Sequence, residues 1–131
     1  MSRFILTIFV FFQFLGISAQ DKKEFKQKFL EAEYFFLIEE YDEAAFLYNE
    51  LLNSDPDNAN LLFLRGASLL SAGKPYESID YLERAVASIS PGYREGSYRE
   101  RNAPKQALFA LAKAYHINED LERALEYYEK Y

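Results

Sequence analysis

The chain has 131 residues, of which half are apolar and 27% are charged, and its 15 basic and 21 acidic side chains give a net charge of −6. This length suits one domain with a modest core. The acidic balance argues against nucleic acid as a partner, because binding to phosphates needs a basic patch. The sequence contains no cysteine, which excludes disulfides, thiolate metal sites and cysteine nucleophiles.

Residues 1–19 differ in character from the rest of the chain. Arg3 precedes an apolar run that ends at Gly16, and small residues follow it up to Ala19. This is the layout of a secretory signal peptide that is cleaved after Ala19. The run is shorter than the roughly 20 residues that span a bilayer, although an uncleaved N-terminal anchor is the alternative. We therefore expect an exported protein with a signal peptide at 1–19 and one domain at 20–131.

From residue 21 onward, apolar residues recur three and four places apart, and proline and glycine fall near the ends of these runs. No stretch alternates with period two for long enough to be a strand. The predicted fold class is therefore all-α. The expected helices span residues 22–38, 42–53, 59–72, 75–89, 104–117 and 121–131.

Three segments repeat one pattern, in which a small residue is followed four places later by a large one and preceded twelve places earlier by a second small residue. The small residues are Ala32 and Ala44, Gly66 and Ser78, and Ala112 and Ala124. Helices cross closely only where side chains are small. The pattern, with its YDEA (41–44) and LRGASLL (64–70) motifs, resembles the tetratricopeptide repeat, a helix–turn–helix unit of 34 residues. The resemblance implies a helical solenoid of about three units, at 25–58, 59–92 and 105–131.

The second and third units are separated by an insertion, residues 93–104, because the units begin 34 and then 46 residues apart. Pro91 is expected to stop the helix before it. Asn102 is expected to cap the next helix, with Pro104 in its first turn. The SYRE motif at 97–100 has the spacing of a capping box, which predicts a short helical turn.

The insertion has two interpretations. It is either a structural plug that folds back on the joint between the units, or an arm that projects toward a partner, since tyrosine and arginine are favoured at interfaces. The arm would present Tyr93, Arg94, Tyr98, Arg99 and Arg101.

The resemblance also implies a binding surface, because in this family the first helix of each unit lines a concave groove that takes a peptide or protein. The matching places of this chain also include Lys26, Asn60, Ala67 and Gln106. The groove residues expected to bind a partner are Phe29, Glu33, Phe36, Phe63, Leu70, Phe109, Lys113 and His116. The three phenylalanines at the fifth place of each unit, at 29, 63 and 109, would form a row that either anchors a partner or completes the core.

The sequence offers no chemistry for catalysis. His116 is the only histidine, and a lone histidine without cysteine makes a poor metal site. We find no nucleophile–base pair, phosphate-binding loop or metal-ligand spacing. We therefore expect no enzymatic activity, no cofactor and no metal.

A signal peptide, two regular units, the insertion and a third unit together look like the N-terminal part of exported proteins of Bacteroidetes-type bacteria. In those proteins the repeats precede a WD40-like (PD40) β-propeller and an OmpA-like domain. This resemblance implies a scaffold or adaptor at the periplasm or the outer-membrane periphery, which binds a protein or peptide and neither binds nucleic acid nor spans the membrane after cleavage. The alternative is a structural spacer or oligomerisation module of a larger outer-membrane-associated protein.

The third unit reaches only Tyr131 and has no polar terminal helix of the kind that covers the last apolar face of a solenoid. We therefore expect that the natural protein continues, or that this end self-associates.

Overall fold

The computed structural model describes residues 2–131, and their side chains from Ala19 onward. The isolated bridge between Ile89 and Ala103 is the only β-type pairing within these residues, so the predicted all-α class is confirmed. The described chain holds six α-helices and one short 3-10 helix: α1 (Ser2–Leu37), α2 (Tyr41–Ser54), α3 (Ala59–Ser71), α4 (Pro75–Ala85), η1 (Val86–Ser88), α5 (Gln106–Ile117) and α6 (Leu121–Lys130).

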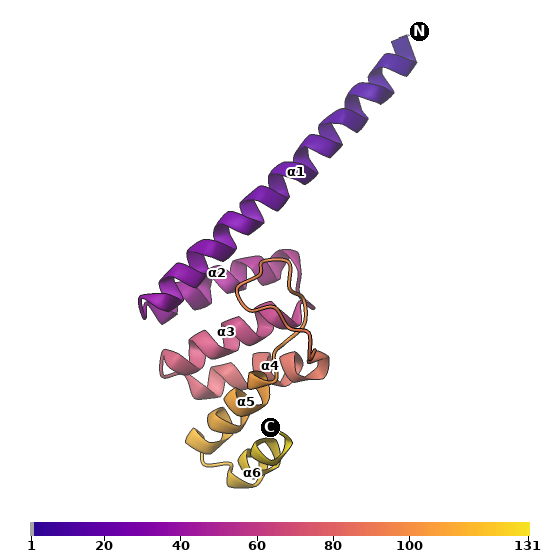
Figure 1. Ribbon diagram of the computed structural model, residues 1–131. Helices are drawn as coiled ribbons and strands as arrows, with labels where there is room; N and C mark the ends of the chain where they lie inside the picture. Colours follow the sequence, from indigo (N-terminus) through magenta and orange to yellow (C-terminus); the bar gives the residue numbers. More distant parts are fainter. Residues whose placement is uncertain (1) are drawn as a thin grey trace.

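The helices stack in chain order as three helix–turn–helix pairs (Figure 1). Each helix packs mainly against its neighbours in the chain, and α3 also contacts α5, so the first helices of the second and third pairs adjoin. The tight turn inside each pair repeats one backbone conformation, with positive φ angles of 66° at Glu39, 78° at Gly73 and 63° at Glu119. These positions are 34 and 46 residues apart, which is the spacing that the sequence predicts for the units.

The six small residues that define the repeat are all buried at helix crossings, namely Ala32, Ala44, Gly66, Ser78, Ala112 and Ala124. The physical reason is clearest at Gly66. A Cβ atom there would lie 2.6 Å from Cγ and 2.8 Å from Cδ2 of Leu82. Because Leu82 is itself fully buried on α4, α3 and α4 approach this closely only when the residue between them lacks a side chain.

The core consists of two apolar clusters that follow the stacking order. The first joins α1, α2 and α3 with Ala85 of α4, Ala103 of the insertion and Ala107 of α5, and the second joins α4, α5 and α6. Phe63 packs against both clusters and so connects them. The hydroxyl of the buried Tyr115 donates a hydrogen bond to the carboxylate of Glu83 at 2.5 Å. Burial is the larger cause and this hydrogen bond the next, and together they raise the pKa of Tyr115 to about 12.

Two helix boundaries differ from the predicted ones for a shared reason. The second helix of unit two ends at Ala85 and continues only as the 3-10 turn η1, and α5 begins at Gln106 rather than at 104. Ala103 donates its N–H to the Ser88 carbonyl at 2.8 Å and accepts from the Ser90 N–H at 3.0 Å. This pairing keeps the backbone extended on both sides, so neither helix can continue through it.

The prediction that Asn102 caps the third unit is therefore wrong. The residue before α5 is Lys105, which makes no side-chain capping bond. Pro104 lies outside the helix, and its carbonyl accepts the N–H of Ala107.

Residues 2–19 of the predicted signal peptide lie in α1, which runs without a break through Ala19, whereas the sequence predicts a helix start near residue 22. Cleavage after Ala19 is a processing event and stays a prediction. No helix in the described part of the chain combines the length and the apolar run that crossing a membrane requires.

Replacing Gly66 by alanine is expected to lower the free energy of unfolding by about 1–3 kcal/mol, because the added methyl group overpacks the contact with Leu82. Helix propensity alone favours alanine by about 1 kcal/mol, so the sign of the effect is diagnostic. Urea denaturation measures it, with Ser71→Ala at the exposed end of the same helix as the control. A stabilised Gly66→Ala protein would contradict the close crossing.

Candidate functional site

The predicted groove residues lie on α1, α3 and α5, the first helices of the three pairs, but their exposure differs from unit to unit. Phe29 is buried; Glu33, Phe36, Phe63 and Leu70 are partly buried; Phe109, Lys113 and His116 are exposed. The exposed fraction of the side chain is 1% at Phe29 and 45% at Phe109, although both occupy the same place of their unit. The three phenylalanines therefore do not form one continuous exposed row.

In unit one, the groove positions serve the core. The ring of Phe29 meets the ring of Tyr48 edge to face with centroids 6.2 Å apart. The Tyr48 hydroxyl donates to the carboxylate of Glu33. Phe36 packs against Tyr41 at 5.2 Å between centroids. The side chain of Phe29 is thus not available to a ligand, as the core interpretation expects.

In unit three, the same face is open and carries a group of aromatic and basic side chains from α5 and α6. Phe109 contacts Tyr128 and Tyr131, with centroids 5.6 and 5.4 Å away. His116 Nδ1 lies 3.3 Å from the hydroxyl oxygen of Tyr128, and Lys113 is exposed on the same helix. We call these five residues the unit-three cluster. The groove positions predicted from the sequence do not include Tyr128 and Tyr131, because these tyrosines lie on the second helix of the unit and at its end.

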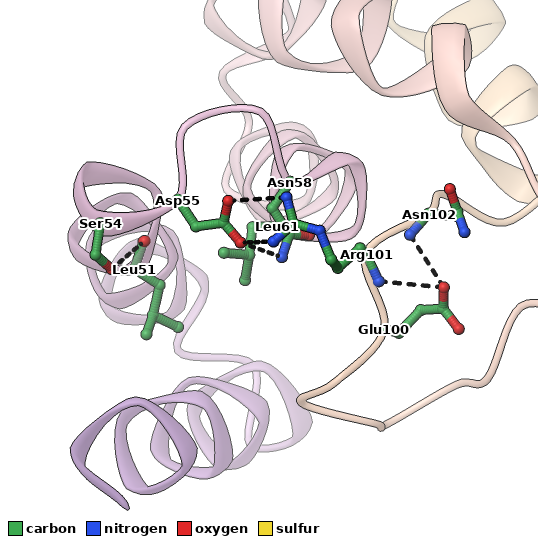
Figure 2. Close-up of polar contacts among 8 residues, drawn as sticks. All are labelled: Leu51, Ser54, Asp55, Asn58, Leu61, Glu100, Arg101 and Asn102. Carbon is green, nitrogen blue, oxygen red and sulfur yellow. Dashed lines mark hydrogen bonds and ion pairs between the residues drawn. The ribbon is translucent and has the colours of Figure 1, made fainter. Parts of the chain in front are cut away.

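The insertion folds back on units one and two, where Arg101 forms an ion pair with Asp55 (Figure 2). Both terminal nitrogens of Arg101 bind the carboxylate of Asp55, with Nη2 and Oδ1 3.0 Å apart. Asp55 also accepts from Asn58 Nδ2 at 3.0 Å. The side chain of Asn58 in turn caps α3 by accepting the N–H of Leu61 at 3.1 Å. Arg101 therefore attaches the insertion to the N-terminal cap of α3.

The carboxylate of Glu100 is buried inside the insertion and holds it together. It accepts the main-chain N–H groups of Asn102 at 3.0 Å, Arg94 at 2.9 Å and Arg101 at 3.2 Å. These hydrogen bonds lower the pKa of Glu100, and the one from Asn102 has the largest effect. One side chain thereby connects residues at both ends of the loop.

This use of Glu100 explains why the predicted capping box at 97–100 does not form. The Ser97 hydroxyl accepts the N–H of Arg99 at 3.3 Å, and the Glu100 carboxylate binds other amides instead of returning to Ser97. The residues form a hydrogen-bonded turn, with the N–H of Glu100 on the carbonyl of Ser97 at 3.1 Å. The expected helical turn is therefore wrong, but the segment is ordered.

The two tyrosines of the insertion lie against the groove face of units one and two. Tyr93 donates its hydroxyl to Asn60 Oδ1 at 2.8 Å. Burial first, and then the negative charge of Glu33, raise the pKa of Tyr93, so the hydroxyl stays protonated as a donor. Tyr98 packs against the first apolar cluster, and Lys26 Nζ lies 5.4 Å above its ring centre.

Of the five predicted arm residues, Tyr93, Tyr98 and Arg101 thus face the repeats, as a plug requires. Arg94 and Arg99 are exposed, as Arg101 also is, but their contacts are with Glu100 and Tyr98 of the insertion itself. Arg94 lies 3.6 Å from Glu100 through Nε.

Three contact residues of this site were not predicted from the sequence, namely Asp55, Asn58 and Glu100, whereas Asn60 is among the predicted groove positions. The signal for Asn58 is present, because asparagine directly before a helix is a common N-cap. The SYRE motif points to Glu100 only as the acid of a capping box, and nothing in the sequence indicates that its carboxylate binds the amides of Arg94, Arg101 and Asn102.

A hollow of about 1080 Å³ lies between residues 21–28 of α1, the end of α2 and the insertion. Acidic and basic side chains line it in equal number, and several neutralise each other, as Lys28 and Glu50 do at 3.2 Å. It therefore has no charge preference that would select a ligand.

Glu100→Gln is expected to lower the free energy of unfolding at pH 7 by about 1–2 kcal/mol, because an acceptor of main-chain amides is lost. The folded-state pKa of Glu100 lies below its unfolded value. Its stabilisation is therefore complete above the unfolded pKa of about 4.3 and is lost as the pH falls through the folded pKa. Denaturation at pH 7 and near pH 3 should show the difference between variant and wild type shrinking on acidification.

The matched control for this experiment is Glu95→Gln, which changes an exposed carboxylate of the same loop. Parallel pH profiles for the wild type and Glu100→Gln would show that Glu100 does not hold the insertion.

Two sequence models described as tetratricopeptide repeat match the chain, one over residues 29–94 and the other over residues 105–131. The stretch between the two matches lies inside the insertion. No curated protein gives a match.

Solved structures show the same fold. A MamA D159K mutant is 24% identical with a TM-score of 0.63, and the match covers 81% of this chain and 52% of that one. A MamA R50E mutant is 23% identical with a TM-score of 0.63, and the match covers 82% of this chain and 69% of that one. The TPR domain of Arabidopsis FLU is 27% identical with a TM-score of 0.63, and the match covers 82% of this chain and 91% of that one.

This chain spans about half the length of the first of these structures. The likeness to the two MamA structures is one of fold. The first family match alone spans half of the sequence, and the repeat geometry agrees with it. The chain therefore belongs to the tetratricopeptide-repeat family.

Proposed function

We propose that this chain is a non-catalytic protein-binding scaffold of the bacterial cell envelope, which takes a protein or peptide on its concave groove face, where unit three is open. The fold supports a role in protein–protein interaction, since stacked repeats leave an extended concave surface. The observation that carries the proposal is the unit-three cluster. Its aromatic rings are partly solvent-exposed at the place where Phe29 is buried in unit one.

The chemistry of this open face indicates the kind of partner. No acidic residue occupies a groove position of units two and three, although the chain carries a net charge of −6. Lys113 is exposed beside Phe109. Exposed aromatic rings next to a basic group suit a segment with an apolar anchor and acidic flanks, because aromatic anchors supply binding energy and charge complementarity supplies specificity.

Envelope location is supported by the sequence of residues 1–19, with Arg3, the apolar run and the small residues before Gln20. The resemblance to exported proteins with a PD40 propeller and an OmpA-like domain supports it further. N-terminal sequencing of the protein from a periplasmic fraction tests it. A chain that begins at Gln20 is expected, and a chain that keeps residues 1–19 in the cytosolic fraction would contradict export.

A second candidate function, self-association as a spacer module, is favoured by one observation. Leu121 and Leu125 on α6 are 63% and 59% exposed. Large apolar side chains exposed on one helix are typical of an interface.

A photo-crosslinking amino acid at position 109 tests the scaffold proposal in cells. Tyr76 on α4, which is 82% exposed, is the matched control because it is an exposed aromatic residue on the second helix of its unit. We expect a discrete crosslinked partner at position 109 and none at position 76. Crosslinks only between copies of this chain, strongest from position 125, would favour the spacer. Equal crosslinking at 76 and 109 would contradict the groove as the binding surface.

A further inference from the structure

We propose that the insertion is a built-in ligand of the groove: it occupies the groove face of units one and two, and a separate peptide with the same tyrosine and arginine side chains takes this place when the insertion is removed. This inference rests on the proposed role of the groove face as a binding surface. It adds that the chain itself closes one part of that surface and leaves unit three open.

The contacts of the insertion coincide with groove positions. Tyr93 binds the side chain of Asn60 at 2.8 Å, and the Asn60 N–H donates to the carbonyl of Arg101 at 3.3 Å. Tyr98 lies beneath Lys26. Asn60 and Lys26 hold the second place of their units, which the resemblance assigns to the groove.

A comparison within the chain supports the same assignment. Phe29 belongs to the apolar cluster against which Tyr98 packs, and it is 1% exposed. Phe109 holds the same place in unit three, and it is 45% exposed. At this place of the repeat, unit one is covered by Tyr48 of α2 and by the cluster that Tyr98 borders, whereas unit three is exposed.

These contacts are of a kind that a peptide reproduces without being part of the chain. A tyrosine hydroxyl donates to an amide oxygen, a guanidinium pairs with the Asp55 carboxylate, and one main-chain hydrogen bond joins the two backbones. Glu100 fixes the loop from inside through three amides of the loop itself. A peptide that contains this glutamate is thus partly preorganised, which lowers the entropy lost on binding.

The insertion leaves and re-enters the solenoid at one point, because Ala103 pairs with Ser88 and Ser90 where the loop closes. The loop can therefore leave the groove while the units on either side stay packed. While it is attached, its effective concentration at the groove is of the order of millimolar, so a free peptide competes poorly with it.

The test uses an opened variant of the full chain, in which residues 92–102 are replaced by a flexible linker of about six glycine and serine residues. The probe is a fluorescent peptide with blocked ends and the sequence GYREGSYRERN, which is that of residues 92–102. Fluorescence anisotropy is expected to show binding to the opened variant at least about tenfold tighter than to the wild type. The control peptide carries Tyr93→Phe and Arg101→Gln and should bind the opened variant at least about tenfold more weakly.

Equal binding of the peptide to the wild type and the opened variant would overturn the inference, and so would no binding to an opened variant that keeps its helical circular dichroism. If the opened variant does not fold, the full-length Tyr93→Phe/Arg101→Gln protein replaces it, with Tyr76→Phe as its control. This double variant should bind the wild-type peptide several-fold more tightly than the control does. Unchanged binding would overturn the inference.

The outcome is separable from that of the proposed function. Crosslinking from position 109 reports on the open part of the groove, which the insertion does not cover. If the peptide binds the opened variant but no partner crosslinks at position 109, the proposed function is contradicted. The inference that the insertion occupies the groove is then still supported.

Discussion

The buried carboxylate of Glu100 is the contact on which the arrangement of this groove depends. It gathers main-chain amides from both ends of the insertion, and thereby turns a stretch rich in glycine and charge into a fixed loop. Only in that loop are Tyr93 and Arg101 directed toward Asn60 and Asp55. This one side chain therefore fixes the conformation in which the insertion lies against the solenoid.

A second constraint, the close crossing of helices at small residues, makes the scaffold on which the loop lies. Gly66 leaves no room for a Cβ against Leu82, and alanine or serine fills the other crossings. Because each pair of helices packs mainly on its neighbours, a loop added at one joint alters the surface without altering the stack. The insertion therefore changes which part of a common fold can be contacted, and unit three, with Phe109 exposed, is the part left open.

The fold could be predicted from the sequence because the repeat is defined by residues that lie close together in the chain. Small residues at fixed spacing, such as Ala44 and Ser78, and the turns between helices reveal the units without knowledge of distant contacts. The insertion was harder to predict because its partners are distant in sequence. Asn102 has the residue type of a cap, but the pairing of Ala103 with Ser88 keeps the chain extended there. Phe29 and Phe109 are equivalent in the repeat, and their difference in exposure cannot be read from the repeat alone.

The central claim is that the insertion is an ordered loop held against the groove. Amide hydrogen exchange of the full chain, followed residue by residue, tests it most directly at Arg94 and Asn102, whose N–H groups bind Glu100, and at Ala103, whose N–H binds Ser88. All three amides are expected to exchange at least about tenfold more slowly than in an unstructured peptide. Exchange at the rate of an unstructured peptide, with the helices still protected, would contradict it.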